Sequence, residues 1–379
     1  MRVIFDARHL QTVSRTRGIG RYSRNLLAGF ARHAPADIEW TLLTLRSFAP
    51  AAPSPLPPHR VRATVRLRRP ELSMLAFDPL LLPFELAGQG DLYHSVQLGL
   101  PAVRRMPVML TIHDLAPLHW PEHYLRLPYS RIGHAWQYAL ARRADAIIAV
   151  SEATRRDVIE RLRIPAERVR VIPEAVDPAF ATAVTAAERD AARARIGVSA
   201  QGERYVIYVG QFDPRKNMDA LFSAFARAAS RDSGLRLVVV GTLGKLASFL
   251  RVALERSRLD PAKVVVTGNV DDRLLAALYA GAECLLHPAH FEGFGLTALE
   301  SLACGTPVVA YRAGAVAEVV GEAGLLVEPG PDSLGDALVR LLDDPALAAA
   351  LRAKAGPRAA AFSWDRAAAE TLAVYRTLG

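Results

Sequence analysis

Two glutamates eight positions apart, Glu292 and Glu300, bracket the segment of the chain best suited to chemistry. After Glu292 the chain reads Gly293, Phe294, Gly295, and the apolar stretch 296–305 that follows has the pattern of a helix. Glycine lets a backbone approach a ligand closely, and the free N–H groups at the start of a helix attract anions. This segment therefore predicts a phosphate site.

Glu300 falls one turn into the predicted helix, among Ala298, Leu299, Leu302 and Ala303. A carboxylate on the inner face of a site can accept two hydrogen bonds from vicinal hydroxyls, as it does from a ribose in dinucleotide sites. The alternative is an ordinary solvated helix residue. Because its neighbours are apolar, we expect Glu300 to face the interior.

A second segment, 208–217, ends a predicted strand in a turn that carries Arg215 and Lys216. Asn217 is suited to cap the helix that follows. Two adjacent cations at the carboxyl end of a strand could neutralise a departing diphosphate. The alternative, a pair of solvated surface cations, is less favoured beside the glutamate segment.

Two further candidates lie in the first half of the chain. His113 and Asp114 end an apolar strand, although a lone histidine is more often structural and Asp114 can simply cap the next turn. Gly18, Gly20 and Arg21 open the first predicted helix, whose start suits a closely approaching phosphate or acceptor.

Short apolar runs alternate with helical patterns along the whole chain, and the pattern restarts near residue 200. Such alternation predicts an α/β protein with parallel sheets covered by helices on both faces. We expect two doubly wound, Rossmann-like domains facing each other across a cleft, with the first ending at residue 180. The predicted strands are 3–7, 40–45, 108–113, 146–150, 169–172, 205–210, 235–241, 263–268, 283–287 and 307–311.

The positive charge of the chain is unevenly distributed. The net charge is +9, and residues 1–180 account for all of it with 25 arginines, no lysine and 16 acidic residues. This distribution fits an arginine-rich proteome, an anionic membrane surface, a phosphate-bearing substrate or nucleic acid, and charge alone does not choose among them. With two cysteines, no signal peptide pattern and no long apolar run, we expect a cytoplasmic protein with at most a peripheral membrane contact.

The glutamate segment, followed by the sequence SLACGTPVVA, resembles the retaining glycosyltransferases of family four, which have the GT-B fold. The resemblance implies that Glu300 holds the nucleotide ribose and that Glu292 lies beside the donor sugar. The amides around Gly293, Phe294, Gly295, Leu296 and Thr297 would meet the sugar and the diphosphate. It also implies roles for Arg215 and Lys216 at the diphosphate and for His113 at the donor sugar.

The sequences HDLAP and GIGRY look most like the mannosyltransferase-like branch that builds O-antigen and related polysaccharides. This likeness implies transfer of a hexose, with mannose from GDP-mannose as first choice, to a glycan or polyprenyl-diphosphate-linked glycan at the cytoplasmic face of the inner membrane. No cofactor is expected. Because the chain has no Asp-x-Asp sequence, we expect metal-independent chemistry. In this fold the nucleotide-sugar domain would span 181–363, and the last helix, 364–379, packs back on the first domain.

Two other classes remain open. A same-fold nucleotide-sugar epimerase or phosphorylase would share the phosphate turn, and a basic nucleic-acid-binding protein would explain the arginines. The sequence also departs from the family at Glu174-Ala175, where members commonly have Asn-Gly, and we expect this turn to differ. His290, beside Glu292, is a second departure.

Overall fold

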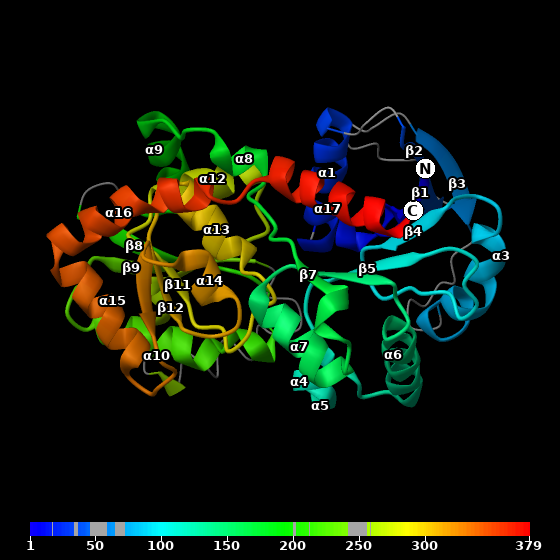
Figure 1. Ribbon diagram of the computed structural model, residues 1–379. Helices are drawn as coiled ribbons and strands as arrows, with labels where there is room; N and C mark the ends of the chain where they lie inside the picture. The colour runs from blue at the N-terminus through cyan, green and yellow to red at the C-terminus, as the bar shows by residue number, and fades with distance from the viewer. Residues whose placement is uncertain are drawn as a thin grey trace. The chain divides into compact units, whose positions relative to one another are not determined.

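The computed structural model describes residues 1–16, 18–33, 37–45, 59–64, 73–199, 202–211, 213–241, 256–257 and 259–379. The chain forms two compact units (Figure 1). Unit 1 comprises Met1–Glu174 and Ser363–Gly379, and unit 2 comprises Ala175–Phe362. The sequence predicted that the chain passes from the first domain to the second between residues 180 and 181, and back to the first between residues 363 and 364. The first lies earlier because the segment after Glu174 packs on unit 2, where the Phe180 ring contacts Tyr279 at 6.1 Å.

Unit 1 is built on a seven-stranded parallel sheet with the order β3-β2-β1-β4-β5-β6-β7. Helices α1 and α17 cover one face of this sheet, and α6 and α7 cover the other (Figure 1). The strands are β1 (Arg2–Asp6), β2 (Glu39–Leu45), β3 (His59–Thr64), β4 (Leu92–Ser95), β5 (Val108–Ile112), β6 (Ala146–Ala149) and β7 (Val169–Val171). The α-helices are α1 (Gly18–His33), α3 (Leu82–Leu86), α4 (Ala116–His119), α5 (Pro121–Tyr124), α6 (Pro128–Ala141), α7 (Glu152–Leu162) and α17 (Trp364–Leu378). Shorter helical turns are η1 (Arg8–Gln11), η2 (Val13–Thr16), the π-helix η3 (Ser73–Leu81) and η4 (Ala166–Arg168).

Unit 2 has a six-stranded parallel sheet with the order β10-β9-β8-β11-β12-β13. The strands are β8 (Arg204–Val209), β9 (Leu235–Val240), β10 (Val264–Gly268), β11 (Leu285–His287), β12 (Val308–Tyr311) and β13 (Gly324–Val327). The helices are α8 (Pro178–Ala181), α9 (Ala186–Arg195), η5 (Pro214–Lys216), α10 (Met218–Ala229), η7 (Pro261–Lys263), α12 (Asp272–Ala280), α13 (Leu296–Ala303), α14 (Val316–Val320), α15 (Ser333–Asp343) and α16 (Pro345–Ala360). One core cluster joins α10 and α15 to the sheet.

The predicted α/β class with two Rossmann-like domains is confirmed, and each predicted strand has a counterpart in the sheets. Strands β3, β4 and β13 were not predicted. β3 and β13 lie at sheet edges, where pairing on one side demands less apolar sequence. The sequence over 123–142 has a helical pattern, but the structure interrupts it, since α5 ends at Tyr124 and α6 begins at Pro128, whose ring suits a first helical position.

The C-terminal helix α17 lies alongside α1 in unit 1 (Figure 1). A buried polar chain joins it to the sheet. The Tyr375 hydroxyl lies 2.7 Å from His94 Nδ1, and His94 Nε2 lies 2.9 Å from the Thr111 hydroxyl. Burial lowers the pKa of His94 to about 3, so the ring is neutral and its two nitrogens need one donor and one acceptor. Tyr375 therefore does more than fill space.

We expect Tyr375→Phe to lower the free energy of unfolding by about 1–3 kcal/mol, because one buried nitrogen of His94 loses its partner. Asp365→Asn, also on α17, breaks the exposed pair with Arg32 of α1 and should cost at most about 1 kcal/mol. Urea unfolding of the full chain measures both. Equal effects of the two substitutions would contradict a special role for the buried chain.

Candidate active site

The candidate site of unit 2 lies where its strand order reverses. Strand β8 has β9 on one side and β11 on the other, and in open α/β sheets ligands bind at the carboxyl ends of the strands at such a point. Turn η5 follows β8. Residues 292–295, called here the glycine-spaced turn, follow β11 and precede α13. The two loops are joined by a hydrogen bond in which the His290 amide donates to the Arg215 carbonyl at 2.8 Å.

Glu292 is the centre of a buried charge cluster in these loops. Lys216 Nζ donates to Glu292 Oε1, and His287 Nε2 lies 3.3 Å from the same oxygen. Burial alone would raise the pKa of Glu292, but Lys216, His287 and Arg215 outweigh it and hold the pKa far below its usual range. Glu292 is therefore ionised, and it holds Lys216 at the carboxyl edge of the sheet.

Local backbone chemistry places the two cations. The Arg215 amide donates to Asp213 Oδ1 at 3.1 Å, which starts η5. Asn217 then adopts a left-handed conformation with φ of 52° and caps α10 by accepting from the Ala220 amide at 3.4 Å, as predicted. Asparagine tolerates this conformation better than most residues.

The glycine-spaced turn has the predicted form. Gly295 has φ of 103°, which favours glycine, and α13 begins at the next residue. A hydrogen bond from the segment before α14 also fixes this turn, because the Ala315 amide donates to the Glu292 carbonyl at 3.0 Å. A side chain at Gly314 would place its Cβ 2.6 Å from that carbonyl oxygen. Leu296 and Thr297 thus head a helix whose start is fixed on two sides.

Glu300 lies on α13 and is 5% exposed, so it is not a solvated helix residue. The Tyr279 hydroxyl donates to Glu300 Oε2 at 3.3 Å. The structure thus brings Lys216, Arg215, Glu292 and Glu300 onto the loops and helix of one switch point. Their ligands remain predictions.

The unit 1 candidates gather at the carboxyl end of β5. His113 Nδ1 lies 2.9 Å from Glu174 Oε1, and the ring of Tyr22, on α1, meets the His113 ring edge-on at 4.7 Å. Helix α1 begins at Gly18 as predicted. Gly20 has a packing reason to be glycine, since its Cβ would lie 2.3 Å from the Ser14 carbonyl oxygen.

Two neighbouring residues have local roles. Asp114 Oδ1 accepts from the Ala116 amide at 3.0 Å, the turn-capping role weighed for it from sequence. Arg21, partly buried on α1, has a further polar contact within the protein. The proposed acceptor role of Gly18, Gly20 and Arg21 stays a prediction.

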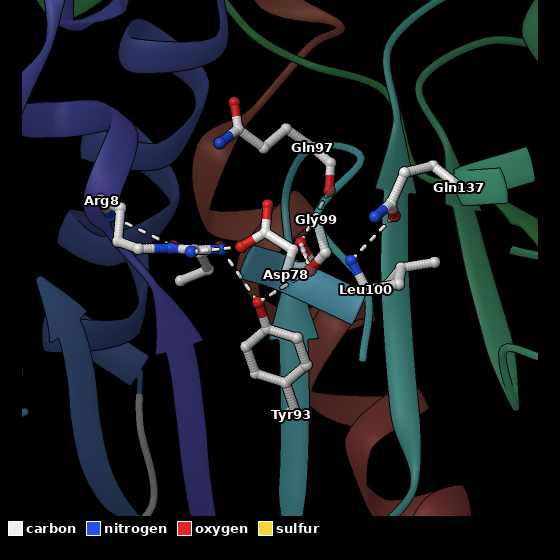
Figure 2. Close-up of polar contacts among 9 residues, drawn as sticks. Arg8, Asp78, Tyr93, Gln97, Gly99, Leu100 and Gln137 are labelled. Atoms are coloured by element: carbon white, nitrogen blue, oxygen red, sulfur yellow. Dashed lines mark hydrogen bonds and ion pairs between the residues drawn. The ribbon is translucent and has the colours of Figure 1, made fainter. Parts of the chain in front are cut away.

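A buried ionic network lies at the switch point of unit 1, between β1 and β4 (Figure 2). Arg8 contacts Asp6 at 2.7 Å and Asp78 at 2.5 Å. The Tyr93 hydroxyl lies 3.0 Å from Asp6 Oδ2 and 3.2 Å from the Gly99 carbonyl oxygen, and the two acceptors share its one proton. This network joins η1, which follows β1, to η3 through charge pairs, and it reaches the loop after β4 at Gly99.

Sequence reasoning missed His287, the partners of Arg8, and the contact between His113 and Glu174. His287 was interpreted only as the end of a strand. The one available signal was the unusual Glu174, which the structure places against His113. Neither Glu174 nor Ala175 has a positive φ, so the turn differs from an Asn-Gly turn as expected.

Comparison with known proteins matches each unit to a family of glycosyltransferases. The model of Glycosyltransferase Family 4 matches residues 16–180, and that of Glycosyl transferases group 1 matches residues 190–359. D-inositol 3-phosphate glycosyltransferase of Kineococcus radiotolerans is 36% identical over 79% of this chain and 71% of its own length. O-antigen chain mannosyltransferase B of Escherichia coli is 28% identical over 76% and 74%.

Among solved structures, sucrose-phosphate synthase from Thermosynechococcus elongatus covers 100% of this chain and 99% of its own, with 23% identity and a TM-score of 0.78. The fold and the matches to known families define a glycosyltransferase of the GT-B type. The chain belongs to glycosyltransferase family 4.

In the described part of the chain, no group of three or more acidic, histidine or cysteine side chains could hold a metal ion.

We expect Lys216→Met to lower stability most at neutral pH, by about 3–5 kcal/mol, because Glu292 is left buried without its main partner. The depressed pKa of Glu292 gives the wild type stability that is present above the ordinary pKa of 4.5 and lost as the pH falls below it. The variant lacks this gain, so the two unfolding free energies should converge on acidification. A gap that stays constant from pH 5 to pH 2 would show that Glu292 is not the group responsible.

Proposed function

We propose that this glycosyltransferase moves a hexose, mannose first, from a nucleotide-diphosphate sugar to a hydroxyl of a glycan or lipid-linked glycan, with retention at the anomeric carbon. The observation that carries the proposal is the cluster of Lys216 and Glu292 beside the glycine-spaced turn. Mannosyltransferases among the relatives support the choice of sugar. GDP is the first-choice nucleotide.

Each part of the unit 2 site has a partner on such a donor. The ammonium of Lys216 and the guanidinium of Arg215 would bind the diphosphate, and the start of α13 at Leu296 and Thr297 would face the same charge. A diphosphate would compete with Glu292 for Lys216, which leaves the carboxylate available to a sugar hydroxyl. Glu300 would accept hydrogen bonds from the ribose.

In the transfer itself, the bond between the anomeric carbon and the diphosphate oxygen breaks as the acceptor oxygen attacks from the same face. The acceptor proton passes to the departing phosphate oxygen. The alternative route uses Glu292 as nucleophile. We favour the same-face route because Glu292 would be engaged by a sugar hydroxyl, and the other carboxylate of the site, Glu300, would already be engaged by the ribose.

The decisive experiment is a screen of GDP-, UDP-, dTDP- and ADP-sugars for nucleotide release, with and without glycan acceptors. Reactions with EDTA and with added Mg²⁺ or Mn²⁺ test the proposed metal independence. An inositol phosphate belongs among the acceptors, because a relative at 36% identity is an inositol phosphate glycosyltransferase. Release of an isomerised sugar nucleotide without acceptor would instead indicate an epimerase.

We expect Glu300→Gln to weaken nucleotide binding roughly ten- to hundredfold, since it loses a charged hydrogen bond of about 1.5–3 kcal/mol to the ribose. A 2′,3′-dideoxy nucleotide should bind the wild type weakly, and the substitution should weaken it little further. Calorimetry measures both, with Glu322→Gln, at an exposed glutamate paired with Lys354, as control. If the substitution weakened the binding of both nucleotides equally, Glu300 would not be the residue that binds the ribose.

We further propose that unit 1 contacts an anionic membrane. All the large apolar side chains that are exposed in the described residues belong to this unit. Leu80, Leu81 and Phe84, the last 75% exposed, lie on η3 and α3. The Ala102 amide donates to the Pro79 carbonyl at 2.9 Å, which places exposed Val103 beside them. No helix in the described ranges is both long and apolar enough to cross a bilayer.

Arg105 and Arg143 are exposed, and Arg143 Nη1 donates to the Ala102 carbonyl at 3.3 Å, next to Val103. Anionic lipids attract such cations. We expect wild-type protein to sediment with vesicles containing phosphatidylglycerol and not with neutral vesicles. Phe84→Ser should reduce the bound fraction severalfold. Glu322→Gln, at an exposed residue of unit 2, is the control and should bind like the wild type. If Phe84→Ser left vesicle binding unchanged, the surface formed by η3 and α3 would not be the membrane contact.

A further inference from the structure

The contact between His113 and Glu174 leaves one atom of each side chain available. Nδ1 of His113 lies 2.9 Å from Glu174 Oε1, and Glu174 is 2% exposed. Within the described structure, His113 Nε2 and Glu174 Oε2 are buried atoms that have no hydrogen-bond partner. Buried polar atoms are nearly always paired, so these two call for an explanation.

The His113 ring is held firmly in one orientation. Tyr22 meets it edge-on with an interplanar angle of 88°, and the Thr154 hydroxyl donates to the His113 carbonyl at 3.2 Å. With the ring fixed, the remaining variable is which nitrogen carries the proton. An ionised carboxylate accepts hydrogen bonds only, so Nδ1 must be the N–H that meets Glu174. Nε2 then presents a lone pair.

A second histidine pair in unit 1 shows what a structural pairing looks like. His119 Nε2 lies 2.6 Å from Asp157, but its Nδ1 is also engaged, with Arg161 Nη2 at 3.1 Å. Both nitrogens of that ring are therefore used within the protein. His113 differs because its second nitrogen is buried without a hydrogen-bond partner, at the carboxyl end of β5.

We propose that Glu174 is a positioning residue, which keeps His113 in the tautomer protonated on Nδ1 so that Nε2 accepts a hydrogen bond from a hydroxyl of the donor sugar. This inference rests on the proposed function. An asparagine at 174 would be one methylene shorter, and its amide could donate as well as accept. It would therefore not specify the proton position, so the assignment belongs to the glutamate of this chain.

The first test reads the proton directly. In full-length protein labelled with ¹⁵N-histidine, long-range ¹H–¹⁵N spectra at neutral pH should show His113 as the Nδ1–H tautomer, assigned by loss of its signal in His113→Asn. Glu174→Gln, which keeps the shape and removes the charge, should shift the ring toward the Nε2–H tautomer. A wild-type ring that is protonated on Nε2, alone or with Nδ1, would overturn the proposal.

The second test asks whether the proton position matters to the sugar. Glu174→Gln should weaken the intact nucleotide sugar at least fivefold and leave affinity for the nucleoside diphosphate alone unchanged. In a His113→Ala background the same substitution should cost less than twofold. Asp157→Asn, which removes the carboxylate from His119, should bind both ligands like the wild type. Equal losses from Glu174→Gln in both backgrounds would refute action through His113.

The two hypotheses fail in different ways. If the wild type binds and transfers no nucleotide sugar, the proposed function fails, while the tautomer measured by NMR still describes the pair. If the wild type transfers sugar but Glu174→Gln binds it normally, the function stands and the positioning role of Glu174 is refuted.

Discussion

Buried carboxylates that must be compensated determine how the carboxyl ends of both sheets are arranged. Leaving such a charge unpaired in the interior costs several kcal/mol, so its partner cannot move away freely. Glu292 fixes Lys216 in unit 2, and Asp6 fixes Arg8 in unit 1. In each unit the paired groups lie at or just beyond the ends of strands near the point where the strand order reverses. Ionic contacts thus hold loops at the edge where apolar packing would leave no polar surface for a ligand.

Local features were the predictable part of this protein. Apolar runs long enough to be buried on both faces indicated the central strands. Asn217 and Gly295 indicated where the helices α10 and α13 begin. The short strand β4, with His94 in it, carried too weak an apolar signal. The edge strand β3 alternates charged residues with apolar ones and did not resemble its neighbours.

The contacts that complete the site were beyond sequence reasoning because they join distant positions. Lys216 and Glu292 are 76 residues apart, and His113 and Glu174 are 61 apart. Residue type and spacing showed that each side chain could do chemistry, but only the sheet topology decides which ones meet. His287 illustrates the limit, since nothing in its immediate sequence distinguishes a strand end from a partner of Glu292.

The position of α17 affects how the protein is made. Unit 1 is discontinuous in sequence, and its core includes Trp364 and Tyr375, which follow the whole of unit 2. During synthesis, the ribosome completes unit 2 before it supplies the helix that covers Phe30 and Trp40. Until α17 is synthesised, the apolar side chains of unit 1 that it covers, such as Phe30 and Trp40, therefore stay exposed. Assembly from the N-terminus is interrupted, and unit 1, although it comes first in the sequence, is the last to be completed.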